Sequence, residues 1–146
     1  MLKLSKNGKT KFYKAHANTF GLSFGLPTTG GTCPGATCGV GGCLDQRNGK
    51  QRTCYMDKCV RIYPALGEVL RHNTSLLASK TRDELVVVLR EMVVGFNKKS
   101  KQPYFRLHFS GDFFSEDYTK AWATVINEFP DIKFWVYTRS FFAVEH

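Results

Sequence analysis

The second half of the chain has a regular spacing of hydrophobic positions that predicts two consecutive helices. Pro64 suits the first turn of a helix, and the apolar residues after it recur on one helical face to about residue 79. Thr81 and Glu84 then have the spacing of a capping box, in which each side chain bonds the backbone of the other residue. The apolar spacing continues from there and predicts that the second helix ends near residues 95–98.

A strand, a helix and a second strand are predicted to follow. Residues 104–109 alternate between two faces as a β-strand does, and residues 132–138 form a second extended apolar run. Between them, Ser115 is placed to cap a helix that ends before Pro130. Such a βαβ unit predicts parallel strands joined by a right-handed crossover. In the first strand, the alternation puts Phe105, Leu107 and Phe109 on one face and Arg106 and His108 on the other.

The first part of the chain lacks this regularity. Residues 1–20 are polar and basic, and residues 21–63 hold all five cysteines and nine of the 13 glycines, which predicts an irregular loop before the α/β part at residues 64–146. The 146 residues suit one domain, 1–146, and are few for a complete α/β barrel, which takes about 250. We expect an α/β fold, either a small, abbreviated barrel-like sheet or an open parallel sheet, preceded by a Gly/Cys-rich irregular metal-binding loop.

Whether the cysteines form disulfides or bind a metal depends on the cellular compartment of the protein. The longest apolar run, Leu85 to Leu89, is far shorter than the roughly 20 residues of a membrane span. The basic N-terminus has no apolar signal-peptide core, so we expect the chain to stay in a reducing cytoplasm, where disulfides are rare. All five cysteines lie between Cys33 and Cys59, and such a tight, odd-numbered cluster favours a metal site over disulfides or unrelated free thiols.

The spacing of the cysteines is compatible with two kinds of metal site. Cys33 with Cys38 and Cys54 with Cys59 form two pairs that would suit a four-thiolate zinc site. The glycines around Cys38 and Cys43 equally suit an iron–sulfur cluster, because loop amides donate hydrogen bonds to cluster sulfurs. Spacing alone leaves zinc and iron–sulfur open.

The net charge of +9 is unevenly distributed along the chain. The first acidic residue is Asp45, and the lysines that precede it are Lys3, Lys6, Lys9, Lys11 and Lys14. A basic segment of this kind predicts weak binding to nucleic acid or another anionic surface. An ordinary solubilising surface would have the same composition.

A series of longer motifs occurs between residues 20 and 140. They are TCPGATC (Thr32 to Cys38), CYM (Cys54 to Met56), RIYP (Arg61 to Pro64), RHN (Arg71 to Asn73), FRLHFSGDFFSEDY (Phe105 to Tyr118) and FPDIKFWVYTRS (Phe129 to Ser140). Together they resemble the phage Gene product 88 family, proteins of bacterial viruses with largely unassigned function. The resemblance implies that Cys33, Cys38 and Cys54 are cluster ligands, because they match cysteine positions of the family.

The layout of that family is similar to that of the radical S-adenosylmethionine enzymes, in which three thiolates hold a four-iron four-sulfur cluster. By this fold-level analogy the turn after the first strand would contact a bound cofactor, through Ser110, Gly111 and Asp112. A fourth thiolate would close the last iron to S-adenosylmethionine and would suit electron transfer, redox sensing or a structural role. We favour Cys43 as that ligand, with Cys59 as the alternative, because residues five apart do not share a helix face if the segment after Cys54 is helical.

Several polar residues have more than one reading. Parallel strands bring their carboxyl ends to one edge, so Ser110, Asp112 and Arg139 are expected to line a crevice facing the cysteines. Asp112 would serve equally well as an ordinary turn aspartate that bonds nearby backbone. For His108, a structural role is favoured over metal ligation, although histidine can bind metals. Asn73 and its neighbour His72 are expected to face solvent or to pack against another helix.

The sequence therefore predicts a phage-encoded four-iron four-sulfur protein with a redox or sulfur-related role in the cytoplasm of the infected host cell. Its redox partner is not identified by the sequence. Two alternatives stay open: a radical S-adenosylmethionine enzyme on an abbreviated barrel, and a zinc-stabilised nucleic-acid-binding module. Whether the chain is an enzyme is also left open.

Overall fold

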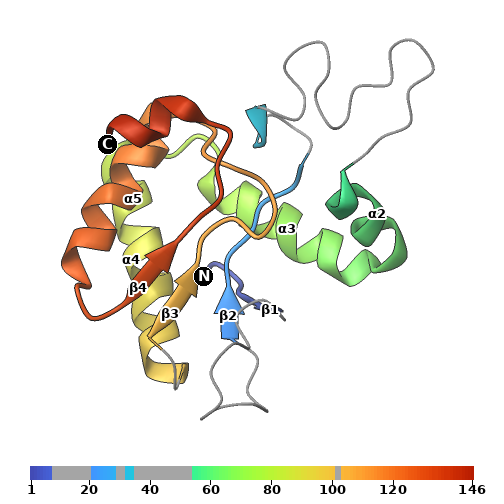
Figure 1. Cartoon of the computed structure of the whole chain (residues 1–146), viewed down its shortest axis with the longest axis horizontal. Coiled ribbons are helices and arrows are strands. Elements are labelled where there is room, and N and C mark those ends of the chain that lie inside the picture. Colours follow the sequence, from blue (N-terminus) through green and yellow to red (C-terminus); the bar gives the residue numbers. More distant parts are fainter. Residues whose placement is uncertain (8–20, 29–31, 35–53, 101–102) are drawn as a thin grey trace.

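The computed structural model describes residues 1–7, 21–28, 32–34, 54–100 and 103–146 (Figure 1). Within them, one open sheet has the strand order β1 (Ser5–Asn7), β2 (Gly21–Ser23), β3 (Tyr104–Arg106) and β4 (Lys133–Trp135). β2 and β3 are parallel, as are β3 and β4, which confirms the predicted βαβ unit. β1 is antiparallel to β2. The open sheet is thus the correct one of the two expected forms, while the barrel-like form and an entirely parallel sheet are wrong for the described residues.

The antiparallel edge strand belongs to the N-terminal segment, which the sequence presented only as polar and basic. Leu2 is buried and Leu4 is half-buried, and both pack against the main core. Two leucines are too few to show the alternation of apolar and polar residues that marks a strand, so the sequence did not predict β1. The segment is held by Asn73, whose side chain accepts a hydrogen bond from Lys3 N (2.8 Å) and donates to Lys3 O (2.9 Å) and to Gly25 O (3.1 Å). Asn73 is fully buried and joins backbone to backbone, so the expectation that it faces solvent or merely packs against a helix is wrong.

The helices of the second half occur where they were predicted. They are α3 (Pro64–Leu77), α4 (Arg82–Lys99) and α5 (Glu116–Glu128), and the short 3₁₀ helix η4 (Phe141–Glu145) follows β4. Pro64 is in the first turn of α3, and both bonds of the capping box between Thr81 and Glu84 are present. Ser115 Oγ accepts a hydrogen bond from Tyr118 N (3.2 Å) and so caps α5. No helix among the described residues has the length and apolar character needed to cross a membrane.

An additional helix, α2 (Tyr55–Ile62), lies inside the segment 21–63 that was expected to be irregular. Its eight residues make about two turns, too few for the apolar spacing to stand out beside the glycines and cysteines. Cys54 is its N-cap residue, so the segment after Cys54 is helical. Helicity of this segment was the condition for expecting Cys59 to point away from Cys54. Strand β2 also lies in this segment.

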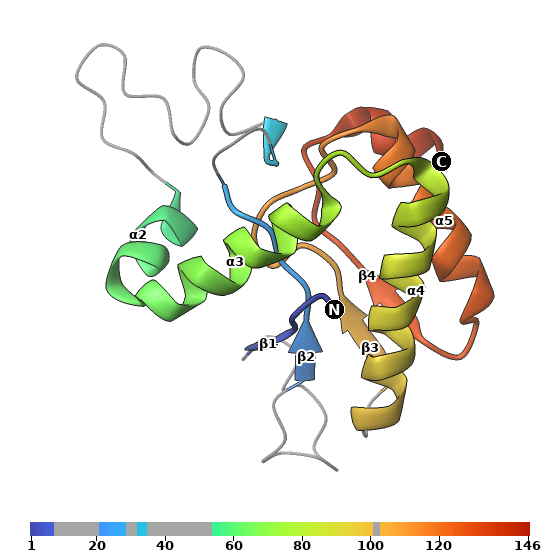
Figure 2. The same cartoon turned by 180° about the vertical axis from the view of Figure 1, so that it is seen from behind.

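The main core lies between the sheet and helices α4 and α5. Figure 1 shows β3 and β4 in front of α4, and Figure 2, seen from behind, shows α4 in front of them. Phe105 of β3 packs edge-to-face on Phe96 of α4, with ring centres 4.8 Å apart, and also lies against Trp122 of α5. Arg106, the next residue, stacks instead on Trp135 of β4. One face of β3 therefore meets the helices, and Arg106 lies away from them.

Strand β3 is shorter than the predicted strand 104–109 because His108 adopts a left-handed backbone conformation, with φ of 49°. Such a conformation is uncommon for a residue other than glycine and interrupts the alternation of faces. Leu107 still packs in the main core, but Phe109 joins a second cluster with Cys54, Met56 and Leu70. The prediction that Phe109 shares a face with Phe105 and Leu107 is therefore wrong.

The ring of His108 packs on different side chains from Arg106, although both residues line the same cavity. Its ring lies edge-to-face on Phe113, with centres 4.6 Å apart, and near Tyr118 of α5. Backbone pairing with the segment after β2 nevertheless continues, since Phe109 N donates to Phe24 O (3.0 Å). The chain thus changes the direction of its side chains while it remains attached to the sheet.

We predict that Gly111→Ala lowers the free energy of unfolding by roughly 1–3 kcal/mol, because a side chain there is strained and has no space. Gly111 has φ of 73°, and a Cβ would lie 2.6 Å from Leu26 Cβ and 2.9 Å from Leu26 O. The matched control is Gly95→Ala in α4, where nothing lies within 4 Å of the added carbon. That change should raise the free energy of unfolding by up to about 1 kcal/mol. Urea unfolding of both variants tests the pair, and equal effects of the same sign would contradict the role of Gly111.

Candidate functional site

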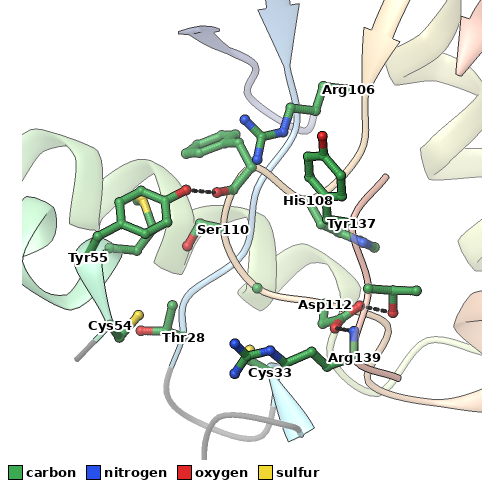
Figure 3. A pocket seen from close by; sticks show the side chains of 14 residues that line it. Thr28, Cys33, Cys54, Tyr55, Arg106, His108, Ser110, Asp112, Tyr137 and Arg139 are labelled. Carbon is green, nitrogen blue, oxygen red and sulfur yellow. Dashed lines mark hydrogen bonds between the residues drawn. The ribbon is translucent and has the colours of Figure 1, made fainter. Parts of the chain in front are cut away.

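A cavity of about 440 Å³ lies at the carboxyl ends of the parallel strands (Figure 3). Its wall comes from the segment after β2, from Cys33, from the start of α2, from the end of β3 with its following turn, and from the segment after β4. Open α/β sheets commonly bind ligands at this edge, because the loops that leave neighbouring strands meet there. The cavity is therefore the candidate functional site.

The structure brings together several residues that the sequence singled out. Ser110, Gly111 and Asp112 line the cavity together with Cys33 and Cys54. Arg139 also lines it, and Figure 3 shows its side chain extending toward Cys33 and Thr28. The crevice that the βαβ argument predicted is present, and what binds in it stays a prediction.

The remaining cysteines divide into two groups. Cys38 and Cys43 lie outside the described residues. Cys59 is half-buried, does not line the cavity and packs against the second apolar cluster beside Met56 and Leu70. Within the described ranges, no group of three or more His, Cys, Asp and Glu side chains is placed to hold a metal ion. The described part of the chain thus offers two thiols to the cavity, and a full thiolate set needs further cysteines.

The start of helix α2 is fixed against the turn after β3. Cys54 is 9% exposed, and its side chain makes no capping hydrogen bond to the helix it precedes. The next residue, Tyr55, donates a hydrogen bond from its hydroxyl to Phe109 O (3.0 Å). This contact sets the position of the Cys54 thiol relative to the turn that carries Ser110.

Asp112 connects three of the segments around the cavity. Its carboxylate Oδ1 accepts hydrogen bonds from Phe113 N (2.8 Å) and Thr138 Oγ1 (2.6 Å), and Oδ2 accepts one from Arg139 N (2.7 Å). Its backbone N donates to Thr32 O (2.7 Å), next to the first cysteine. We call this arrangement the Asp112 clasp. Asp112 bonds the backbone of its own turn, as an ordinary turn aspartate does, and it also bonds the segment after β4 and the segment at Thr32. A direct contact of Asp112 with a cofactor stays a prediction.

The imidazole of His108 is a buried, neutral group at the cavity wall. It is 3% exposed, and its Nε2 lies 2.9 Å from the hydroxyl of Tyr118. Burial lowers the pKa of His108 to about 4, because removal from water disfavours the charged ring more than the nearby Asp112 carboxylate favours it. Burial also raises the pKa of the Tyr118 phenol. The two side chains therefore meet as neutral partners at physiological pH.

Arg106 is a cavity residue to which the sequence gave no role beyond its strand face. It is 5% exposed, and its guanidinium carbon lies 5.0 Å from the ring centre of Trp135 and 6.0 Å from that of Tyr137. The available signal was a permanent cation between Phe105 and Leu107 in the predicted strand, since arginine is seldom buried without a partner. The lysines at positions 9, 11 and 14, which suggested binding to nucleic acid, lie outside the described residues.

The fold and the cavity define an open-sheet α/β protein with a cysteine-bearing site at its strand ends. The Gene product 88 family model matches residues 2–146, and the chain belongs to this family of bacteriophage proteins. It is 38% identical over 122 residues to the Gene 88 protein of Mycobacterium phage D29 and 39% identical over 122 residues to that of Mycobacterium phage L5. Each alignment covers 80% of this chain and 47% of the relative, so the chain spans about half the length of the curated relatives it matches. No solved structure matches the chain.

These matches confirm the family that the sequence motifs resembled. They attach no cofactor, substrate or reaction to it, so the iron–sulfur and S-adenosylmethionine expectations stay predictions. The identity of the bound group has to be argued from the cavity itself.

We predict that His108 makes the protein less stable as the pH falls from neutrality. The folded state has the lower pKa, so between about pH 6.5 and 4 the unfolded chain binds the proton more readily, and acidification favours unfolding. From about pH 7 to about pH 5, the free energy of unfolding should fall by about 2 kcal/mol more in the unchanged protein than in His108→Asn. Asparagine does not titrate and tolerates a positive φ. Urea unfolding at both pH values measures the difference, and parallel losses in the two proteins would contradict the prediction.

Proposed function

We propose that this phage protein holds an iron–sulfur cluster at the strand-end cavity and uses it in a redox or sulfur-related role in the infected cell. The observation that carries the proposal is that Cys33 and Cys54, from separate segments, line one cavity together with the polar turn at Ser110. Thiolates are soft ligands that suit iron–sulfur clusters or zinc. The two described thiols fit such a centre as part of its ligand set.

The proposed set is completed by Cys38 and Cys43, which lie between the other two in the sequence. Cys59 is left out of it, because its side chain packs in an apolar cluster and does not line the cavity. The chain's own contribution is to hold Cys54 in place through α2 and to fix the wall beside Cys33 through the Asp112 clasp. When bound, the cluster would supply one-electron transfer.

The size and lining of the cavity favour a cluster over a closed structural zinc site. Structural zinc sites are four-coordinate and leave no open position for a ligand. Here about 440 Å³ of space adjoins the two thiols, and Ser110 and Arg139 line the same space. An iron–sulfur cluster, with several iron and sulfide atoms, fills more of this space than a single zinc ion, and only its three-thiolate form would also leave one iron open to a ligand.

The same observation favours one second candidate, a radical S-adenosylmethionine enzyme. In that case three thiolates would hold the cluster, and the turn at residues 110–112 would face the cofactor at the open iron. Binding of S-adenosylmethionine to the loaded protein would support this form. Its absence, together with loss of iron in Cys43→Ser, would support the four-thiolate form.

We predict that protein purified without oxygen contains iron and acid-labile sulfide in about equal amounts. Cys33→Ser and Cys54→Ser should lose most of both, because each removes a ligand, and should become less soluble, because ligand bonds order the glycine-rich segment. Cys59→Ser is the matched control and should keep its iron, since Cys59 packs away from the cavity. Iron, zinc and sulfide analysis of the three variants measures this. Stoichiometric zinc without sulfide, or an iron loss in Cys59→Ser equal to that in Cys54→Ser, would overturn the proposed ligand set.

A further inference from the structure

The cavity wall contains a buried cation for which the described residues supply no anion. Arg106 is 5% exposed, forms no ion pair with a described carboxylate, and has an Nε–H without a hydrogen-bond acceptor. The faces of Trp135 and Tyr137 hold the guanidinium but balance only part of its charge. Because a buried, unpaired charge is costly, its presence at a cavity indicates a bound partner.

Two further polar atoms on the same stretch of chain are also without partners. Ser110 Oγ and His108 Nδ1 are buried and make no hydrogen bond within the described part of the chain, and both residues line the cavity. Ser110 is 4% exposed and His108 is 3% exposed. Since buried polar atoms in proteins nearly always have partners, three unsatisfied atoms at positions 106, 108 and 110 point to a ligand.

The charges around the cavity select an anion. Among the described residues that line the cavity, Asp112 is the only carboxylate, and its oxygens already accept three hydrogen bonds in the clasp. Arg139 lines the cavity from an exposed position and adds a second positive charge. The hydroxyl of Ser110 is free to donate to an acceptor beside Arg106.

We propose that the cavity binds the carboxylate of a small organic molecule, against Arg106 Nε and Ser110 Oγ. One buried guanidinium matches the single charge of a carboxylate, whereas a doubly charged phosphate would need a second buried cation, and Arg139 is exposed. A cavity of about 440 Å³ is within the range that holds small-molecule ligands. The inference goes beyond the proposed function, because it rests on Arg106 and Ser110 whether the thiols hold iron, zinc or nothing.

The test is titration of the full chain, purified without oxygen, with three probes at constant ionic strength: propionate, its neutral amide propionamide, and inorganic phosphate. Trp135 lies beside Arg106, so its fluorescence reports binding. Propionate should bind saturably, propionamide should not, and phosphate should bind about tenfold more weakly than propionate. Arg106→Gln should weaken propionate binding about tenfold or more, which is the usual size of a lost hydrogen bond to a charged group.

Two other variants sharpen the test. Ser110→Ala should weaken propionate binding to a smaller extent and keeps the test decisive if Arg106→Gln does not fold. Arg82→Gln removes the same charge from an exposed position at the start of α4 and should change affinity by less than about twofold.

Three results would overturn the inference: equal binding of propionate and propionamide, tighter binding of phosphate than of propionate, or equal effects of Arg82→Gln and Arg106→Gln. Iron and sulfide are assayed on the same samples. Propionate binding without a cluster would therefore contradict the proposed function alone, and a cluster without propionate binding would contradict this inference alone.

Discussion

The Asp112 clasp is the interaction on which the rest of the site depends. The strands of the described sheet are three residues long, so their ladders fix little of the chain beyond them. Beyond the strand ends, one buried carboxylate accepts two backbone amides and a hydroxyl, and the backbone N of the same residue donates to Thr32 O. Hydrogen bonds to an ionised group are stronger than neutral ones, and removal of the carboxylate would leave buried donors without acceptors.

Neighbouring contacts depend on the clasp and reinforce it. The hydroxyl of Ser140 donates to Phe113 O (2.7 Å) and so gives the segment after β4 a further bond to the turn, while Ser140 N donates to Thr138 Oγ1 (2.9 Å) within that segment. Gly111 allows the turn to approach Leu26 so closely that no side chain would fit. As a result Arg139, Ser110 and the segment that carries Cys33 share one cavity. Function at strand ends is commonly organised in this way, with reactive groups on loops that a rigid scaffold positions.

The parts of the fold that the sequence predicted are those with local signals. Pro64, the Thr81–Glu84 capping box and Ser115 each act within one helical turn, so α3, α4 and α5 could be located from neighbouring residues alone. The parallel pairing of β3 with β4 followed from the helix between them. The neighbourhood of Ser110 and Asp112 with Cys33 and Cys54 followed in turn from that topology.

The features that escaped prediction depend on contacts between distant segments. Asn73 is buried because it satisfies the backbone of Lys3 and Gly25, more than forty residues away in each case. The positive φ of His108 is held by packing on Phe113 and Tyr118, and no local pattern announces it. A sequence likewise does not show whether the charge of an arginine such as Arg106 is balanced by a neighbour.

The most direct test of this account is a double-mutant cycle on the clasp, with Asp112→Ala, Thr138→Val and the double variant compared by urea unfolding. Thr138 Oγ1 and Asp112 Oδ1 are 2.6 Å apart in a largely buried setting. If the clasp joins the two strand-end segments, the coupling free energy should be about 1 kcal/mol or more. Additive effects of the two substitutions, to within about 0.3 kcal/mol, would show that the segments are held by other contacts and would contradict the account.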